Sequence, residues 1–253
     1  MRRVLKIGGR AQDDPRLISQ IVASLVVGDS IAVVHGGGDA VTVLQRRLGL
    51  SPEFRGGRRV TNEEDLEIVR MVLSGVINKR LVAQLITSGV QAVGISGEDG
   101  ACIQARVTDP AYGRVGGAII VSPVLITHLW SGGFVPVISP LGRDADDPNG
   151  RGLNINGDDA AAALAVALGA GELLLIADVP GVLDNSGVTI PNLTGVAAQA
   201  LVAGGIAKGG MAAKLEAGAL ALHGGVPYVR IGDLHAITDA AAGTRLLMSP
   251  ESG

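Results

Sequence analysis

The chain has 253 residues, of which 47% are hydrophobic, 18% are charged and 2% are aromatic, and its formal net charge at pH 7 is −3. Such a chain can bury a large aliphatic core, and its length fits one α/β domain, 1–253, built either on a single sheet or on one sheet that carries two lobes. The mild negative charge argues against nucleic acid or an anionic membrane as a partner. The scarcity of aromatic residues argues against base stacking on single strands.

The cysteine and histidine content limits the kinds of site. Cys102 is the single cysteine, which excludes an intramolecular disulfide, and we expect it to serve as a small residue in or near a strand. The four histidines are scattered and no Cys/His cluster has zinc-like spacing, so no metal-ligating residues are predicted. The first apolar run is too short for a signal peptide and no run is long enough to span a bilayer, which favours a cytoplasmic protein.

Strand-like and helix-like segments alternate along the chain. Strands are predicted at 4–7, 31–34, 92–95, 135–138, 173–177 and 226–231, and helices at 17–27, 40–48, 61–73, 78–88, 123–131, 160–168 and 212–222. The glycine-rich segment 104–121 is predicted to form a hairpin or an excursion, and the polar stretch 143–151 a loop near which the two lobes meet. The alternation predicts a mainly parallel sheet with helices on both faces.

Two glycine clusters follow short apolar strands. They are Lys6-Ile7-Gly8-Gly9 and Val34-His35-Gly36-Gly37-Gly38. Glycine lets backbone N–H groups approach an anion closely, so two such loops on neighbouring strands would form one anion-binding crevice, with Lys6 as a cation in it. The second cluster is also compatible with an ordinary strand-to-helix turn. A dinucleotide site is disfavoured because Val41 stands where the third glycine of that fingerprint belongs.

Two segments in the middle of the chain carry side chains that suit an anionic ligand. Arg58 and Arg59 precede a predicted helix, and arginine is the natural bidentate clamp for a carboxylate, although both are equally compatible with a solvated surface. Asn154-Ile155-Asn156-Gly157-Asp158 opens another helix, where these polar groups serve either as caps or as ligand contacts.

Two later segments carry similar candidates. Asp178 stands at the carboxyl end of a very apolar strand, where α/β proteins place ligands, although turn formation alone explains the Pro180-Gly181 pair beside it. Lys214 lies about one turn inside a helix of small residues after a glycine pair. It is either a site residue or a solubilising charge.

Together these segments resemble the amino-acid kinase family, and within it the N-acetylglutamate kinase branch. The resemblance covers nearly the whole chain in order. Its motifs are Lys6-Ile7-Gly8-Gly9, Val34-His35-Gly36-Gly37-Gly38, Arg59-Val60-Thr61, Asn154-Ile155-Asn156-Gly157-Asp158, Ala177-Asp178-Val179-Pro180-Gly181-Val182-Leu183, and Gly209-Gly210-Met211 followed by Lys214. The resemblance implies a three-layer αβα fold, with an N-lobe (1–169) that binds the acylated amino acid and a C-lobe (170–253) that binds ATP.

The reaction implied by the resemblance transfers the γ-phosphoryl group of ATP to the side-chain carboxylate of N-acetyl-L-glutamate, a step of arginine biosynthesis. A carboxylate is already ionised at neutral pH, so this acceptor needs no general base, and catalysis depends on positioning and charge neutralisation. The resemblance implies that Lys6 and Lys214 contact the transferring group from opposite lobes, and that Asp158 holds both lysines by ion pairing.

The resemblance also implies the binding residues. The acceptor would be bound by Gly9, Gly37, Gly38, Arg59, Asn154 and Asn156. The nucleotide would be surrounded by Asp178, Val179, Pro180, Gly181, Val182, Leu183, Ile206, Ala207, Lys208, Gly210 and Met211. Mg²⁺ would be held mostly by phosphates and water, which needs no carboxylate cage.

Some positions depart from the family pattern and leave alternatives open. Gly157 stands where alanine is common, Arg58 where an apolar residue is usual, and Arg10 where a small or polar residue is common. The acceptor could instead be N-succinylglutamate or an N-blocked α-aminoadipate of lysine biosynthesis, and a catalytically inactive sensor is a further alternative. Because a strand starts by about Val4, with no room before it for the extra helix of arginine-inhibited members, we predict a homodimer without arginine feedback.

Overall fold

The computed structural model describes residues 1–26, 29–55 and 58–248. The chain forms two compact units. Unit 1 consists of Met1–Ile31 and Ala161–Gly253, and unit 2 of Ala32–Ala160. The units do not follow the expected boundary between 169 and 170, because the first strand and helix pack with the C-terminal part of the chain.

Unit 1 is built on strands in the order β12-β14-β13-β11-β1. Their bounds are β1 (Arg2–Ile7), β11 (Glu172–Ile176), β12 (Asn192–Thr194), β13 (Tyr228–Gly232) and β14 (Thr244–Leu247). β11 pairs in parallel with β1 and β13, and its five residues are all buried, as expected for an aliphatic strand covered on both faces. β14 runs antiparallel to β13.

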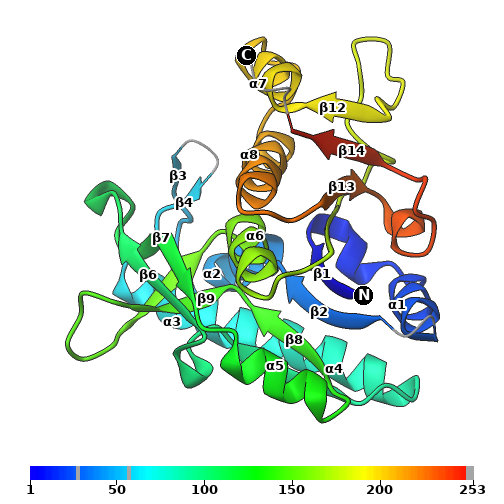
Figure 1. Ribbon diagram of the computed structural model, residues 1–253. Coiled ribbons are helices and arrows are strands. Elements are labelled where there is room, and N and C mark those ends of the chain that lie inside the picture. Colours follow the sequence, from blue (N-terminus) through cyan, green and yellow to red (C-terminus); the bar gives the residue numbers. More distant parts are fainter. Residues whose placement is uncertain (27–28, 56–57, 249–253) are drawn as a thin grey trace. The chain divides into compact units, whose positions relative to one another are not determined.

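Helices cover these strands. They are α1 (Leu17–Val26), most of α6 (Gly157–Ala167), α7 (Gly195–Ala203) and α8 (Gly210–His223), with 3-10 helices η1 (Gly9–Asp13) and η5 (Leu234–Ile237). α8 packs directly on β13 (Figure 1). A Cβ added to Gly218 in this helix would lie only 2.5 Å from Leu246 and 3.2 Å from Val229, so the helix approaches the strands too closely for a larger residue.

Unit 2 contains three parallel strands in the order β2-β8-β5. They are β2 (Ser30–His35), β5 (Ala92–Ser96) and β8 (Val135–Ser139). The helices are α2 (Gly38–Arg47), α3 (Glu63–Arg70), a π-helical segment (Met71–Ile77), α4 (Asn78–Thr87) and α5 (Val124–Ser131). α4 packs on β5 and β8 (Figure 1). The two units together confirm the predicted α/β class, with eight mainly parallel strands and flanking helices.

The segment predicted as a hairpin or an excursion is a hairpin that belongs to a small closed barrel. β6 (Ile103–Val107) and β7 (Val115–Val121) pair antiparallel, and β9 (Leu141–Asp144) and β10 (Gly152–Ile155) complete the barrel. Short 3-10 helices, η3 (Asp99–Ala101) and η4 (Pro110–Tyr112), lie beside these strands in sequence. A two-residue ladder, β3 (Phe54–Arg55) with β4 (Arg58–Arg59), stands apart from the barrel.

Two predictions of helix boundaries need correction. The predicted helices 61–73 and 78–88 are joined without a break, because the π-helical segment carries the chain from α3 into α4. The helix begins after Asn62 rather than at Thr61, since Asn62 and Asp65 form the reciprocal capping box. The strands β12 and β14 and helix α7 were not predicted, because their sequences are short or rich in alanine.

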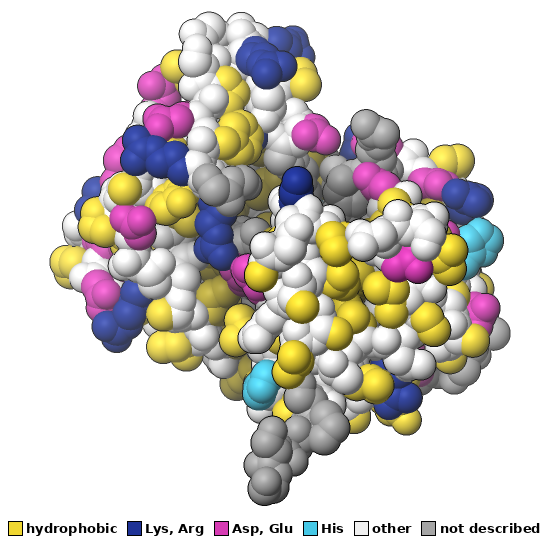
Figure 2. Space-filling model, turned by 90° about the horizontal axis from the view of Figure 1, so that it is seen from above, with side chains coloured by type: hydrophobic (Ala, Val, Ile, Leu, Met, Phe, Trp, Pro, Cys, Tyr) yellow, Lys and Arg dark blue, Asp and Glu magenta, His cyan; other side chains and the backbone are white. Residues whose placement is uncertain are grey.

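Acidic and basic side chains are interspersed over the face shown in Figure 2, in keeping with the small net charge. In the part of the chain that the structure describes, no helix is both long and apolar enough to cross a membrane. Cys102 lies directly before β6, near a strand as predicted; it is buried, and burial raises the pKa of its thiol to about 11.

Candidate active site

The glycine cluster of unit 2 connects β2 to α2. Gly37 has φ +153°, and a Cβ there would overlap Cδ1 of Ile77 and lie 2.7 Å from Cδ2 of Leu73. Both the backbone conformation and the packing therefore require glycine at this position. This requirement is stronger than that of an ordinary strand-to-helix turn, because Leu73 and Ile77 come from the π-helical segment that packs beneath the loop.

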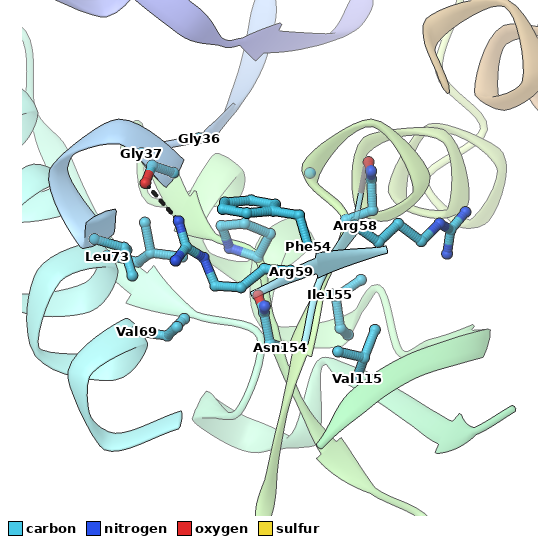
Figure 3. A pocket seen from close by; sticks show the side chains of 15 residues that line it. Gly36, Gly37, Phe54, Arg58, Arg59, Val69, Leu73, Val115, Asn154 and Ile155 are labelled. Atoms are coloured by element: carbon cyan, nitrogen blue, oxygen red, sulfur yellow. Dashed lines mark hydrogen bonds between the residues drawn. The ribbon is translucent and has the colours of Figure 1, made fainter. Parts of the chain in front are cut away.

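A pocket of about 200 Å³ lies beside this glycine loop in unit 2 (Figure 3). Its wall combines backbone of the loop, two arginines of β4, aliphatic side chains and two amides. The lining residues are Gly36, Gly37, Gly38, Val41, Phe54, Arg58, Arg59, Val69, Leu73, Val115, Pro140, Asn154, Ile155, Asn156 and Gly157. Five of the six residues predicted to bind the acceptor thus meet at one cavity. The sixth, Gly9, lies at the start of η1 in unit 1.

Arg59 projects toward the glycine loop and is 8% exposed (Figure 3). Its Nη2 donates to the carbonyl oxygen of Gly38 at 2.8 Å and to Oγ1 of Thr42 at 2.6 Å. The Phe54 ring stacks on the guanidinium at 4.6 Å. Burial lowers the pKa of Arg59, against the opposing effect of Asp65 and Asp39, but arginine stays charged at neutral pH. The pocket therefore contains a fixed cation, which suits a carboxylate.

The neighbouring Arg58 points the other way. Its Nη2 pairs with Oδ2 of Asp159 at 3.3 Å, and both side chains remain partly exposed. Alternate residues of a strand face opposite sides, so only Arg59 is directed at the glycine loop. Of the two arginines that the sequence presented, Arg59 is the one that the structure places in the interior of the pocket.

The two amides of the segment before α6 have different local partners. Nδ2 of Asn154 donates to Oγ1 of Thr61 at 3.1 Å. Oδ1 of Asn156 accepts from the backbone N–H of Asp158 at 2.8 Å, so Asn156 caps helix α6. Asp158 lies in the first turn of that helix and is 4% exposed. Helix capping thus accounts for the hydrogen bond of Asn156 to Asp158. Asn154 forms part of the pocket wall.

The glycine cluster of unit 1 brings two lysines together. A Cβ added to Gly8 would lie 2.5 Å from Nζ of Lys6 and 3.9 Å from Nζ of Lys214. Lys6 is 7% exposed and Lys214 is 8% exposed. Two ammonium groups gathered around a glycine, in partly dehydrated surroundings, place positive charge where an anion could bind. The solubilising role considered for Lys214 is excluded by this burial.

The segments predicted to surround a nucleotide also belong to unit 1. After β11, the chain from Asp178 to Leu183 is held to β14 by a hydrogen bond from the N–H of Val182 to Oγ1 of Thr244 at 2.8 Å. The segment 206–211 leads into α8, where the residue before the helix, Gly209, has φ +53°. A Cβ added to Gly209 or to Gly210 would meet no atom within 4 Å, so the backbone of both residues is accessible.

The sequence profile of the amino acid kinase family matches residues 1–233 of this chain. The chain belongs to the amino acid kinase family. Among curated relatives, the acetylglutamate kinase of Rubrobacter xylanophilus is 45% identical over 93% of this chain and 89% of its own length. The acetylglutamate kinase of Methylobacillus flagellatus is 40% identical over 95% of this chain and 88% of its own.

The fold of this amino acid kinase is also found in solved structures. A protein of Streptococcus mutans UA159 has a TM-score of 0.86 at 30% identity, over 97% of this chain and 98% of its own. A carbamate kinase of Giardia lamblia bound to AMP-PNP has a TM-score of 0.74 at 16% identity, over 98% of both chains. The low identity of the second limits that comparison to the fold.

The residues that the structure describes contain no group of three or more His, Cys, Asp or Glu side chains arranged to hold a metal ion. The buried cations Lys6 and Lys214 suit phosphate oxygens rather than a metal. These residues fit a nucleotide that carries its own Mg²⁺, because Mg²⁺ commonly keeps its waters and binds through substrate phosphates.

His35 ends β2 just before the glycine loop and is fully buried. Its Nδ1 donates to the carbonyl oxygen of Gly36 at 2.9 Å, and its Nε2 accepts from Nδ2 of Asn78 at 3.2 Å, which describes a neutral imidazole. Burial lowers the pKa of His35 to about 4, and the nearby Lys79 and Arg80 add to this effect. The glycine loop therefore starts from a residue that resists protonation.

We expect the free energy of unfolding to decrease as the pH is lowered, because the buried His35 resists protonation. The imidazole of His35 takes up a proton near pH 6.5 in the unfolded chain but only near pH 4 in the folded protein. The stabilising contribution of the neutral His35 is therefore fully present above pH 6.5 and is lost as the pH falls toward 4. The expected loss between pH 7 and pH 5 is about 2 kcal/mol. Urea unfolding of the wild type and of His35→Gln at several pH values measures it. An equal pH dependence in both proteins would contradict the assignment.

Sequence reasoning missed several residues that build this site. Phe54, Thr42 and Gln45 all contact Arg59. A signal existed for Gln45, since it lies four residues after Val41 and so shares the buried face of α2. A polar residue on such a face usually has a specific partner.

Proposed function

We propose that the protein transfers the γ-phosphoryl group of ATP to the side-chain carboxylate of N-acetyl-L-glutamate. This is the reaction of an acetylglutamate kinase in arginine biosynthesis. The observation that carries the proposal is the pocket of unit 2, in which a buried arginine, a glycine loop and an amide surround a small cavity. The high identity to relatives named acetylglutamate kinase supports it. A cavity of about 200 Å³ suits a small acylated amino acid rather than a macromolecule.

Arg59 is proposed to bind the α-carboxylate of the acceptor. Its guanidinium is charged, buried and directed at the cavity, so an ion pair there is less screened than at the surface. Asn154 is proposed to hydrogen-bond the acetamido group, since an amide side chain can both donate and accept. The N–H groups of Gly37 and Gly38 are proposed to approach the reacting carboxylate, and the N–H of Gly9, in the first glycine loop, is proposed to approach it as well.

The phosphoryl transfer itself is proposed to depend on charge neutralisation by lysines rather than on a general acid or base. The acceptor carboxylate attacks phosphorus, the bond to the β,γ-bridging oxygen breaks, and ADP leaves with that electron pair. Lys6 and Lys214 are proposed to neutralise the equatorial oxygens of the transferring group, since both ammonium groups gather at Gly8. Asp158 is proposed to orient the lysines.

The nucleotide is proposed to lie along the segments 178–183 and 206–211 of unit 1. These segments follow a sheet strand and precede a helix, the places where α/β proteins bind ligands. Mg²⁺ is proposed to enter with the nucleotide and to supply further charge neutralisation on the phosphates. The predicted homodimer stays a prediction, which light scattering of the purified protein can measure.

The proposal is tested by ADP release from MgATP, with N-acetyl-L-glutamate, N-succinyl-L-glutamate and N-acetyl-L-aminoadipate offered in parallel and hydroxylamine present to trap the acyl phosphate. We expect a hydroxamate and a clear preference for N-acetyl-L-glutamate. A preference for another acceptor would keep the chemistry and overturn the substrate. Absence of turnover with all three would favour the sensor alternative.

A further inference from the structure

Gln45 is a buried polar residue that is not among the residues lining the acceptor pocket but contacts Arg59, which is. It lies on α2 and is 1% exposed. Its Oε1 accepts a hydrogen bond from Nη1 of Arg59, and its Nε2 donates to Oδ1 of Asp65. Because an amide buried without partners is costly, both ends of this side chain are held by specific contacts.

The chemistry of its partners decides which way the amide faces. Arginine only donates hydrogen bonds and an ionised aspartate only accepts them, so the oxygen of Gln45 must face Arg59 and its nitrogen must face Asp65. The amide thus connects a cation to a carboxylate that do not touch each other in the hydrogen-bond pattern. A carboxylate or an aliphatic side chain at position 45 cannot make both contacts.

Asp65 is itself fixed by the start of α3. Its Oδ2 accepts from the N–H of Asn62 at 3.2 Å, while the N–H of Asp65 donates to Oδ1 of Asn62 at 2.8 Å. This capping box holds the carboxylate at the first turn of the helix. The hydrogen bonds that lead from Asn62 through Asp65 and Gln45 to Arg59 therefore begin at a capped helix terminus.

Arg59 has five N–H donors, and three hydrogen bonds to Gln45, Gly38 and Thr42 hold it within the protein. Two of these partners, Thr42 and Gln45, lie on α2, and the third is the carbonyl of its first residue. The guanidinium is thus fixed relative to the glycine loop, with its Nε–H making no hydrogen bond to the described residues. Gln45 is the partner that also connects the guanidinium to α3.

We propose that Gln45 is a positioning residue that orients the guanidinium of Arg59 toward the acceptor's α-carboxylate, an inference that rests on the proposed function. Without its amide, Arg59 loses the contact that ties it to Asp65 and gains freedom to rotate about its side-chain bonds. Acceptor binding then has to restore the order that Gln45 supplies in advance, and affinity for the acceptor falls. The chemical step and the nucleotide site are untouched.

The test is Gln45→Leu, which keeps the size of the side chain and removes both polar ends. Because a hydrogen bond to a charged group is lost, we expect KM for the acceptor to rise about tenfold to a hundredfold. We expect kcat to change less than about threefold and KM for ATP to stay the same. The matched control is Arg47→Gln, an exposed residue of the same helix, which is expected to behave as the wild type.

A double-mutant cycle separates positioning from general damage to the fold. If Gln45 acts through Arg59, then Gln45→Leu adds little to the acceptor KM once Arg59→Ala is present. An undiminished effect of Gln45→Leu in that background would overturn the proposal. So would an unchanged acceptor KM in the single variant.

A measurement without turnover distinguishes this proposal from the proposed function. In nitrogen NMR, a guanidinium held by several partners shows hindered rotation, and we expect separate Nη signals for Arg59 in the wild type and averaged signals in Gln45→Leu. Averaged signals in both proteins would overturn the positioning role even if the enzyme is active. Lack of turnover with every acceptor would instead overturn the proposed function, while the NMR comparison still decides the role of Gln45.

Discussion

Lys6→Ala is expected to lower kcat by about a hundredfold to a thousandfold while KM for the acceptor changes little. The ammonium group of Lys6 lies beside Gly8 together with that of Lys214, and both are buried. A cation in such surroundings acts mainly on charge that develops in the transition state, so its loss affects the chemical step more than binding. Steady-state ADP release with each substrate varied in turn measures both constants.

The control for this variant removes one positive charge from an exposed position outside the site. Arg47→Ala removes an exposed cation of α2 and is expected to leave both kcat and KM near the wild-type values. Lys214→Ala is expected to resemble Lys6→Ala, since both groups gather at the same glycine. Turnover of Lys6→Ala within threefold of the wild type would contradict its assigned role.

Gly37→Ala is expected to reduce kcat/KM for the acceptor by about a hundredfold and to destabilise the protein. The residue has φ +153°, and a Cβ there would overlap Ile77 and press on Leu73. Backbone strain of this kind costs about 1–3 kcal/mol, and the overlap adds to it. The loop relieves the overlap only by moving away from the pocket that it lines. Urea unfolding and steady-state kinetics measure the two effects.

Two further variants separate the strain from the overlap. Gly49→Ala, just beyond the end of α2, has φ +80° but nothing within 4 Å of its Cβ position, so it should lose stability without losing activity. Adding Ile77→Ala to Gly37→Ala removes the overlapping methyl group, and part of the activity should return. If the double variant is no more active than Gly37→Ala, packing beneath the loop is not the cause.

Much of the fold was predictable because its strands are short aliphatic runs. The strand predicted at 173–177 is found at Glu172–Ile176, and the one at 92–95 at Ala92–Ser96, since a run of buried apolar residues has few alternatives in a parallel sheet. The join between α3 and α4 was not predictable. Local signals of a helix end, such as Gly75, were outweighed by packing along the continuous helix.

The candidate site was likewise predictable only in part from the sequence. Arg59 and Asn154 were identified from their motifs, and both line the pocket. The partners that hold Arg59 were not, because Phe54, Thr42 and Gln45 belong to no motif and depend on how β3 and α2 pack beside β4. The compact units also differ from the expected lobes, since β1 pairs with β11, far along the chain.

The sequence by itself determined the family, the α/β class and the candidate residues of the site, because each follows from a local pattern of residue types. Only the tertiary structure decided which of these residues meet. Lys6 and Lys214 converge at Gly8, and Gln45 connects Arg59 to Asp65, through contacts between residues distant in the chain. Such contacts arise when strands pair and helices pack, and a linear pattern does not encode their geometry.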